Sequence, residues 1–139
     1  MFSRVLVPVD LSQSNIEAVG VAGELARLGG GEIILLHVIE TIEDVEWQEI
    51  EEFYRGIQAR ARSLLNELKL SLEAPPGGVR EELVYGRRVR EILAAVERLG
   101  CDLVVLHSHR VDAENPTVGI GTLSHEVAVL APCPVLLVK

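Results

Sequence analysis

Two short apolar runs near the end of the chain, at 102–107 and 134–138, constrain its fold more than any other feature. Between them lie a polar stretch, a Gly-Ile-Gly-Thr sequence at 119–122 and an apolar segment at 123–131, an order that predicts strand, loop, helix and strand. Both runs are apolar at consecutive positions, which is typical of strands covered on both faces of a parallel sheet. The connection is too long for a hairpin and suits a parallel crossover. The loop after the first run should therefore open at the carboxyl end of a parallel sheet, where α/β proteins bind ligands.

The rest of the chain repeats this alternation. Apolar runs at 4–9 and 32–39 predict two more strands, and the alternating run at 79–85 predicts an edge strand that ends at Gly86. Helical patterns fill the intervals, which gives five strands and four helices in strict alternation. This order predicts a single α/β domain over residues 1–139. The expected fold is a doubly wound parallel sheet with helices on both faces, a three-layer sandwich.

The other predicted helices have recognisable ends and buried stripes. Ser14 and Glu17 have the spacing of a capping box, so a helix should begin near Ser14 and end in the glycines at 29–31. A longer helix should span about 43–73, and a third should end at Gly100. The expected buried residues are Ile16, Val19, Ala22, Gly23 and Ala26 in the first helix and Ile50, Phe53, Ile57, Ala61, Leu64 and Leu68 in the second.

Composition and charge exclude several classes of protein. With 48% hydrophobic and 24% charged residues, the chain should be globular rather than disordered. A net charge of −8 argues against general nucleic-acid binding, because few cations are available to displace counterions from phosphates. No apolar run approaches the ~20 residues that a membrane-spanning helix needs, and no signal peptide is recognisable. Cys101 and Cys133 have no metal-binding spacing and should be small buried residues, as suits a reducing cytoplasm.

The sequence offers no convincing catalytic or metal site. A response regulator would need an acceptor carboxylate where the third strand ends in Tyr85 and Gly86, and a flavodoxin would need a phosphate loop after the first strand. No Walker lysine, GxSxG or HExxH motif is present. The four histidines are scattered, and His107 and His109 should point to opposite sides of an extended chain. We therefore expect no catalytic residue and no metal ligand.

Several segments taken together resemble the universal stress protein family over the whole chain. They are Val5-Leu-Val-Pro-Val-Asp10 with Ser12 and Ser14, Leu36-His-Val-Ile39, Gly86 before Ile92-Leu93-Ala94, Cys101-Asp-Leu-Val-Val105, Ser108-His109, Gly121-Thr122 and Ala131-Pro-Cys-Pro-Val-Leu-Leu-Val138. The resemblance implies the strand order 3-2-1-4-5, a homodimer and a cytoplasmic stress-response role. In one branch of the family it also implies binding of ATP or AMP.

The nucleotide-binding branch has the pattern Gly-x-x-Gly, nine residues, then Gly-Ser/Thr. Its glycines let backbone N–H groups approach phosphates, and the following helix N-terminus favours anions. In this chain the first part reads His107-Ser-His-Arg110, and the spacer to Gly121 and Thr122 is one residue longer. The downstream part, with Gly119, Gly121 and Thr122, is therefore a candidate phosphate nest, whereas the upstream part is lost. Arg110 could fill the phosphate pocket or replace the missing glycine with a cation, and we favour the first interpretation.

If a nucleotide binds, the resemblance implies contacts from three parts of the chain. The first strand and its loop would contribute Pro8, Val9 and Asp10, and the second strand would contribute Val38 or Ile39, all at the adenosine end. Asp10 has an equally good alternative role as a cap on the N–H groups of its own loop. The remaining candidates follow the fourth strand: Ser108, Arg110, Gly119, Gly121, Thr122 and Leu123.

Two functions of different classes remain open. The first is a dimeric regulatory protein with a degenerate adenine-nucleotide site, which binds ATP weakly or not at all and requires no cofactor. The second is a genuine AMP- or ATP-binding module, with Mg²⁺ and slow hydrolysis. The tetrad at 107–110 discriminates between them, because intact glycines there would favour the second.

The last strand is the expected dimer interface. In the order 3-2-1-4-5 it lies at an edge of the sheet, and natural edges are protected by charge, proline or a cover. The other edge carries Arg80, Glu81 and Glu82, whereas the last strand has no charge before Lys139. Pairing with its own copy about a two-fold axis would satisfy the edge. The expected interface residues are Val135, Leu136, Leu137 and Val138.

Overall fold

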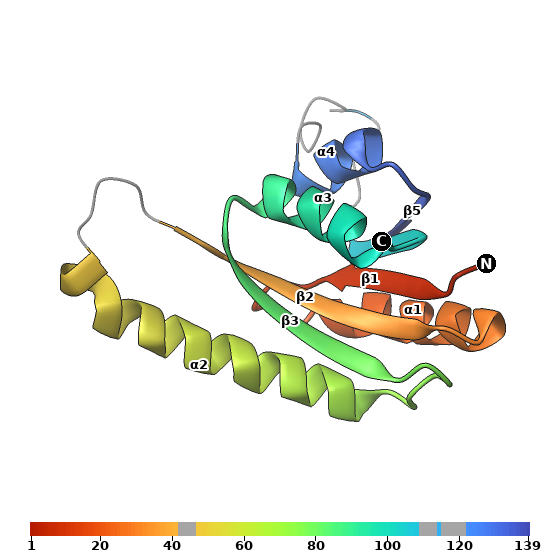
Figure 1. Ribbon diagram of the computed structural model, residues 1–139, viewed down its shortest axis with the longest axis horizontal. Helices are drawn as coiled ribbons and strands as arrows, with labels where there is room; N and C mark the ends of the chain where they lie inside the picture. The colour runs from red at the N-terminus through yellow and green to blue at the C-terminus, as the bar shows by residue number, and fades with distance from the viewer. Residues whose placement is uncertain (42–46, 109–113, 115–121) are drawn as a thin grey trace.

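The computed structural model describes residues 1–41, 47–108, 114 and 122–139, with side chains from residue 50 onward in the helix that begins at Trp47. Strands and helices alternate along the chain as the sequence predicts (Figure 1). The elements are β1 (Arg4–Pro8), α1 (Asn15–Gly29), β2 (Glu32–Glu40), α2 (Trp47–Ser71), β3 (Val79–Gly86), α3 (Arg88–Leu99), β4 (Leu103–His107), α4 (Leu123–Leu130) and β5 (Val135–Val138).

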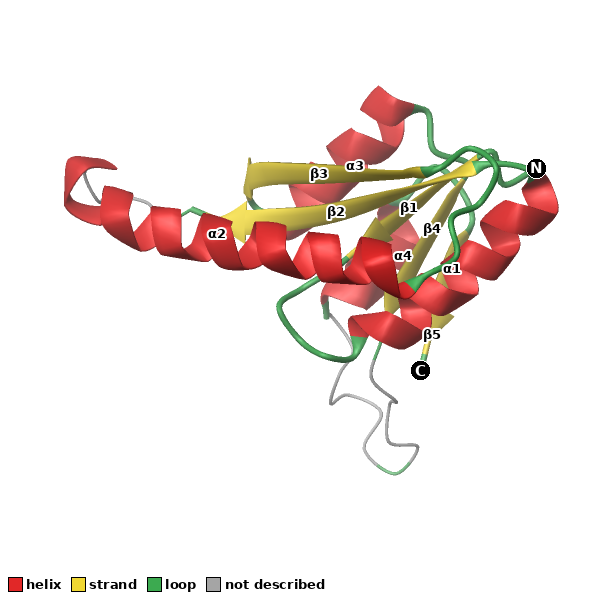
Figure 2. Ribbon diagram, turned by 90° about the horizontal axis from the view of Figure 1, so that it is seen from below, coloured by secondary structure: helices red, strands yellow, loops and turns green. Residues whose placement is uncertain are grey.

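The five strands form one parallel sheet in the order β3-β2-β1-β4-β5, which confirms the predicted topology. In the middle of the sheet, Val5 pairs with Ile33 on one side and Leu103 on the other. β1 is therefore central, and the strand order reverses between β1 and β4. Figure 2 shows the strands fanning out between the helices. A reversal of this kind separates the loops on either side of it and opens a crevice at the carboxyl ends of the strands.

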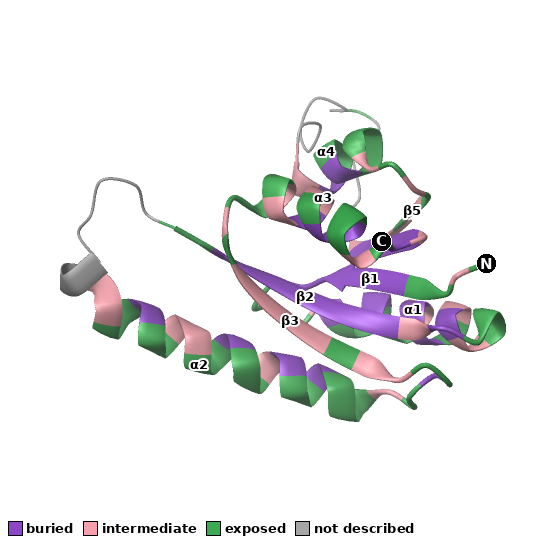
Figure 3. Cartoon of the chain, viewed as in Figure 1, coloured by how far each residue is buried: buried purple, intermediate pink, exposed green. Residues whose placement is uncertain are grey.

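Two hydrophobic clusters cover the two faces of the sheet. On one face, Val5 and Val7 pack against Ala22 of α1 and Leu65 of α2. On the other face, Leu6 and other strand residues pack with α3 and α4. Figure 3 shows the buried central strands between helices whose outer sides are exposed. The alternation of side chains along each strand divides the consecutive apolar residues between the two clusters, as expected for a doubly wound sheet.

The prediction of a buried side chain is wrong for Ile16 and Phe53. Ile16 is 52% exposed, because the buried stripe of α1 begins one residue earlier, at Asn15. Phe53 is 56% exposed, and its neighbour Tyr54 occupies the buried position, where its ring makes an edge contact with Tyr85 of β3. An apolar residue next to a buried stripe is rotated by about 100° from it on a helix, so the pattern alone cannot identify the buried member.

The ends of α1 and α3 agree with the sequence except for one side chain, whereas α2 ends at Ser71, two residues before the predicted end, and its predicted start at 43–46 lies outside the described residues. Gly30 and Gly100 adopt left-handed conformations, with φ of 65° and 64°, and their N–H groups bond back to the ends of α1 and α3. α1 begins where expected, but Ser14 makes no side-chain capping bond. Its hydroxyl instead lies 3.1 Å from the hydroxyl of Ser12.

The two edge strands differ from the central ones. β3 is largely half-buried, as its alternating sequence predicts. β5 was expected to be covered on both faces, but it is half-buried, with Leu136 exposed, because a strand with one neighbour lies at the margin of the helical layers. In the parts of the chain that the structure describes, no helix has the length and apolar character needed to span a membrane.

Candidate functional site

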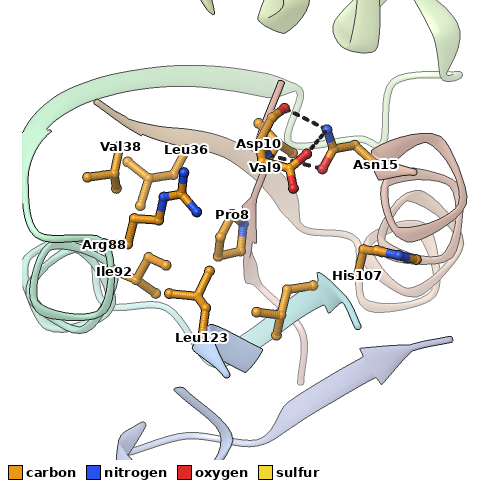
Figure 4. A pocket seen from close by; sticks show the side chains of 11 residues that line it. Pro8, Val9, Asp10, Asn15, Leu36, Val38, Arg88, Ile92, His107 and Leu123 are labelled. Atoms are coloured by element: carbon orange, nitrogen blue, oxygen red, sulfur yellow. Dashed lines mark hydrogen bonds between the residues drawn. The ribbon is translucent and has the colours of Figure 1, made fainter. Parts of the chain in front are cut away.

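A crevice lies at the carboxyl ends of β1, β2 and β4, where the strand order reverses. It encloses about 50 Å³ (Figure 4). The strands supply an apolar floor, and three helices supply residues from their first two turns: Asn15 of α1, Arg88 and Ile92 of α3, and Leu123 of α4. The complete lining is Pro8, Val9, Asp10, Asn15, Leu36, Val38, Arg88, Ile92, Leu106, His107 and Leu123.

Asn15 holds the loop that carries Asp10 at the mouth of the crevice. Its side-chain amide donates to the carbonyl oxygens of Asp10 and Ser12 over 2.7 and 2.8 Å, and its Oδ1 accepts from the Asp10 N–H over 3.2 Å. Asn15 is only 3% exposed, so these bonds replace those that water would make. The tight turn between β1 and α1 therefore depends on one buried amide.

The Asp10 carboxylate caps its own loop. Its Oδ1 accepts from the Ser12 N–H over 2.8 Å and lies 3.2 Å from the Asn15 amide nitrogen. Burial raises the pKa of Asp10, but the hydrogen bonds from Ser12 and Asn15 and the charge of Arg88 outweigh it, so the pKa lies below its ordinary value. Asp10 is therefore an ionised acceptor that both caps the loop and lines the crevice.

Polar side chains on the neighbouring strands fix the floor. His37 is buried, and its Nδ1 donates to the carbonyl oxygen of Val9 over 2.7 Å, which fixes the tautomer with the proton on Nδ1. Ser108 follows β4, and its hydroxyl lies 2.9 Å from that of Ser124 in α4. The Thr122 hydroxyl lies 3.2 Å from the same Ser124 oxygen. These hydroxyls tie the start of α4 to the end of β4.

Five of the predicted site residues line the crevice: Pro8, Val9, Asp10, Val38 and Leu123. Ile39 does not, because adjacent residues of a strand point to opposite faces of the sheet. Ser108 and Thr122 belong to the set of hydroxyls just described, which links the end of β4 to the start of α4. Arg110, Gly119 and Gly121 lie outside the described residues.

The sequence interpretation missed six lining residues. Asn15 and Arg88 are polar, and the sequence contains a signal for each. Asn15 directly follows the predicted N-cap. Arg88 belongs to a run of arginines at a helix start, where cations are unfavourable. The remaining missed residues, Leu36, Ile92, Leu106 and His107, have the appearance of ordinary strand and helix residues in the sequence.

Metal or thiol chemistry finds no support in the described residues. No group of three histidine, cysteine or acidic side chains that could hold a metal ion occurs among them. Cys101 and Cys133 are free thiols. The pKa of Cys101 is raised to about 11, mainly by burial and secondly by the nearby Cys133 thiol. The Cys101 thiol therefore stays protonated and is a weak nucleophile. The lining of the crevice itself combines apolar side chains with hydrogen-bonding groups, which suits a ligand bound without covalent chemistry.

Comparison with known proteins identifies relatives of the whole chain. The Universal stress protein family matches residues 1–139. The universal stress protein YxiE of Bacillus subtilis is 28% identical over 151 residues, which cover 100% of both chains. Among solved structures, the universal stress protein UspA from Lactobacillus plantarum superposes with a TM-score of 0.83, at 20% identity, over 99% of this chain and 98% of that one.

Two further structures with the same fold contain ligands. A universal stress protein in complex with cAMP has a TM-score of 0.73 at 22% identity, over 99% of this chain and 97% of that one. The universal stress protein from Archaeoglobus fulgidus in complex with dAMP has a TM-score of 0.64 at 17% identity, over 100% of both chains. At these identities the likeness extends to the fold alone.

Proposed function

Because the chain belongs to the universal stress protein family, we propose that it is a regulatory stress-response protein whose crevice binds the adenosine part of an adenine nucleotide. The single observation that carries this proposal is the pairing of an apolar floor with an ionised acceptor at its mouth. Val38 and Ile92 offer apolar surface to a flat base. Asp10, held by Asn15, offers carboxylate oxygens to the hydroxyls of a ribose.

The dimensions of the crevice favour weak binding of a small nucleotide. Its enclosed volume of about 50 Å³ is far below the ~300–1,000 Å³ of a typical small-molecule site, so it covers only part of a ligand. The glycines that would hold a triphosphate are replaced in the tetrad at 107–110. We therefore propose that AMP binds in preference to ATP. The complexes of two proteins of this fold with cAMP and dAMP support the choice of a monophosphate.

The test is calorimetric titration of the purified protein with adenosine, AMP and ATP, with GMP as the control for base recognition. We expect measurable binding of adenosine and AMP, weaker binding of ATP and none of GMP. At a concentration 100 times its Kd, a ligand stabilises the folded state by ~2.7 kcal/mol, so a thermal melt provides a second readout. If neither adenosine nor AMP binds at millimolar concentration, the proposal is wrong. Tight binding of ATP would contradict the preference.

A second part of the proposal is a homodimer formed through β5. Within the described chain β5 pairs only with β4, so its outer edge presents backbone groups without a strand partner. Leu136 on this strand is 38% exposed, and no charged residue protects the strand before Lys139. An uncharged edge of this kind favours pairing with a second copy about a two-fold axis. We also assign the protein to the cytoplasm, where its free thiols would remain reduced.

A further inference from the structure

An open groove of about 680 Å³ adjoins the crevice and crosses the starts of α3 and α4. Arg88 and Leu123 line both hollows, so the groove continues directly from the crevice. Its lining is otherwise Glu40, Arg87, Val89, Arg90, Leu93 and Glu126. The atoms of a ligand that extend beyond the crevice could therefore lie in this groove.

The groove concentrates positive charge on an acidic protein. It contains three arginines against two glutamates, whereas the whole chain has a net charge of −8. Arg87, Arg88 and Arg90 surround the first turn of α3, where the helix dipole is already positive and cations are unfavourable. The Arg87 side chain makes no capping bond to the first turn of α3, so capping does not account for the cluster. A bound anion would compensate for both the dipole and the arginines.

Arg88 is the arginine best placed to reach a ligand. In Figure 4 its guanidinium extends from α3 over the crevice, on the side opposite Asn15. Its Nε lies 3.7 Å from Glu40, and both side chains are about half exposed, at 47% and 60%. An exposed pair at this distance contributes little. The two terminal NH₂ groups of Arg88 make no hydrogen bond to any described residue. They are therefore available to bind an anion through two parallel hydrogen bonds.

We propose that Arg88 binds the phosphate of the nucleotide, in the groove between the starts of α3 and α4, with Arg87 and Arg90 adding to the positive field. A guanidinium binds a phosphate through two parallel hydrogen bonds, so it supplies the contacts that the missing glycines would have made. The charge of Arg88 also contributes to the lowered pKa of Asp10, as expected if the two groups face the same hollow from opposite sides. This inference rests on the proposed adenosine site.

The test compares AMP with adenosine, which lacks only the phosphate. Calorimetric titrations use the wild type, Arg88→Gln and Arg88→Lys, with Arg98→Gln as the control. Arg98 lies on the same helix, is 51% exposed and also forms a 3.7 Å pair, with Glu82, but it does not line the groove. We expect Arg88→Gln to weaken AMP binding by about 10- to 100-fold and to leave adenosine binding unchanged. Arg88→Lys should give an intermediate loss, and Arg98→Gln none.

The possible failures are distinguishable. A wild type that binds adenosine and AMP equally, or an Arg88→Gln variant that binds AMP as the wild type does, overturns the role of Arg88 and leaves the adenosine site intact. Equal losses for adenosine and AMP in Arg88→Gln also overturn it, since they indicate a structural role. If the wild type binds neither ligand, the proposed function and this inference both fall. Circular dichroism of each variant verifies that the fold is retained.

Discussion

Replacing Asn15 by alanine should destabilise the fold and loosen the candidate site together. The amide makes two short bonds to carbonyl oxygens, at 2.7 and 2.8 Å, and accepts one from the Asp10 N–H at 3.2 Å. A typical hydrogen bond contributes ~0.5–1.5 kcal/mol net, and water can reach part of the loop because Asp10 is exposed. We therefore expect Asn15→Ala to lower the free energy of unfolding by about 2–3 kcal/mol, or the melting temperature by roughly 10 °C.

The assay is urea unfolding followed by circular dichroism, with Asn66→Ala as the matched control. Asn66 lies on the exposed side of α2, where alanine is a better helix former, so that variant should be unchanged or slightly more stable. Asn15→Asp keeps the shape but brings a second carboxylate next to that of Asp10, and its loss of stability relative to the wild type should be larger at pH 7 than at pH 4. A loss below about 1 kcal/mol in Asn15→Ala would refute the reasoning, since water would then replace the amide at little cost.

Three further predictions concern other parts of the molecule. Burial raises the pKa of Asp102, but the N–H groups of Ser3 and Arg4, which donate to its carboxylate over 2.9 and 3.0 Å, give a net lowering. A lowered folded-state pKa means that the stabilisation is present above the unfolded-state pKa and is lost as the pH falls through the folded-state value. Asp102→Asn should therefore be less stable than wild type at pH 7 and approach it in acid, as measured by urea unfolding at several pH values; a constant difference would contradict this. A methyl group at Gly31 would collide with the backbone oxygens of Phe2 and Ser3, whereas one at Gly20 in α1 would meet nothing within 4 Å. Thermal melts should show Gly31→Ala destabilised and Gly20→Ala stabilised by ~0.5–1 kcal/mol, and similar melts for the two would be the contrary result. Light scattering should give a dimer for the wild type and a monomer for Leu136→Lys; a monomeric wild type would exclude the dimer, and a dimeric variant would move the interface away from β5.

The sequence predicts the fold well because its information there is local. Consecutive apolar residues mark the covered strands β1, β2 and β4, alternation marks the edge strand β3, and glycines mark the ends of α1 and α3. β5 has the consecutive pattern too but is only half-buried, because it lies at an edge. The buried face of each helix is predicted less accurately from the sequence. Ile16 and Tyr54 show this, because rotation of a helix by one residue exchanges a buried side chain for an exposed one without changing the period of the pattern.

The candidate site is predicted only in part because its residues come together through tertiary structure. Asp10 follows β1 and Val38 lies near the end of β2, and both strand ends can be recognised in the sequence, so their position at the carboxyl edge can be expected. Arg88 reaches the crevice from the start of α3, far along the chain, and no short motif connects it to Asp10. Asn15 resembles an ordinary residue at a helix start, and its buried bonds become visible only when the loop closes.

The way the sheet is wound explains why loss of the glycine motif does not abolish the crevice. α1, which follows β1, packs on one face of the sheet, and α4, which follows β4, packs on the other. The two connections diverge from neighbouring strands, so the hollow between them is a consequence of topology. In the sequence, residues 109–121 follow β4, whereas Asp10 and Asn15 lie between β1 and the start of α1, and Arg88 begins α3. Substitutions in that segment can therefore remove a phosphate nest while the apolar floor, the carboxylate and the guanidinium remain in place.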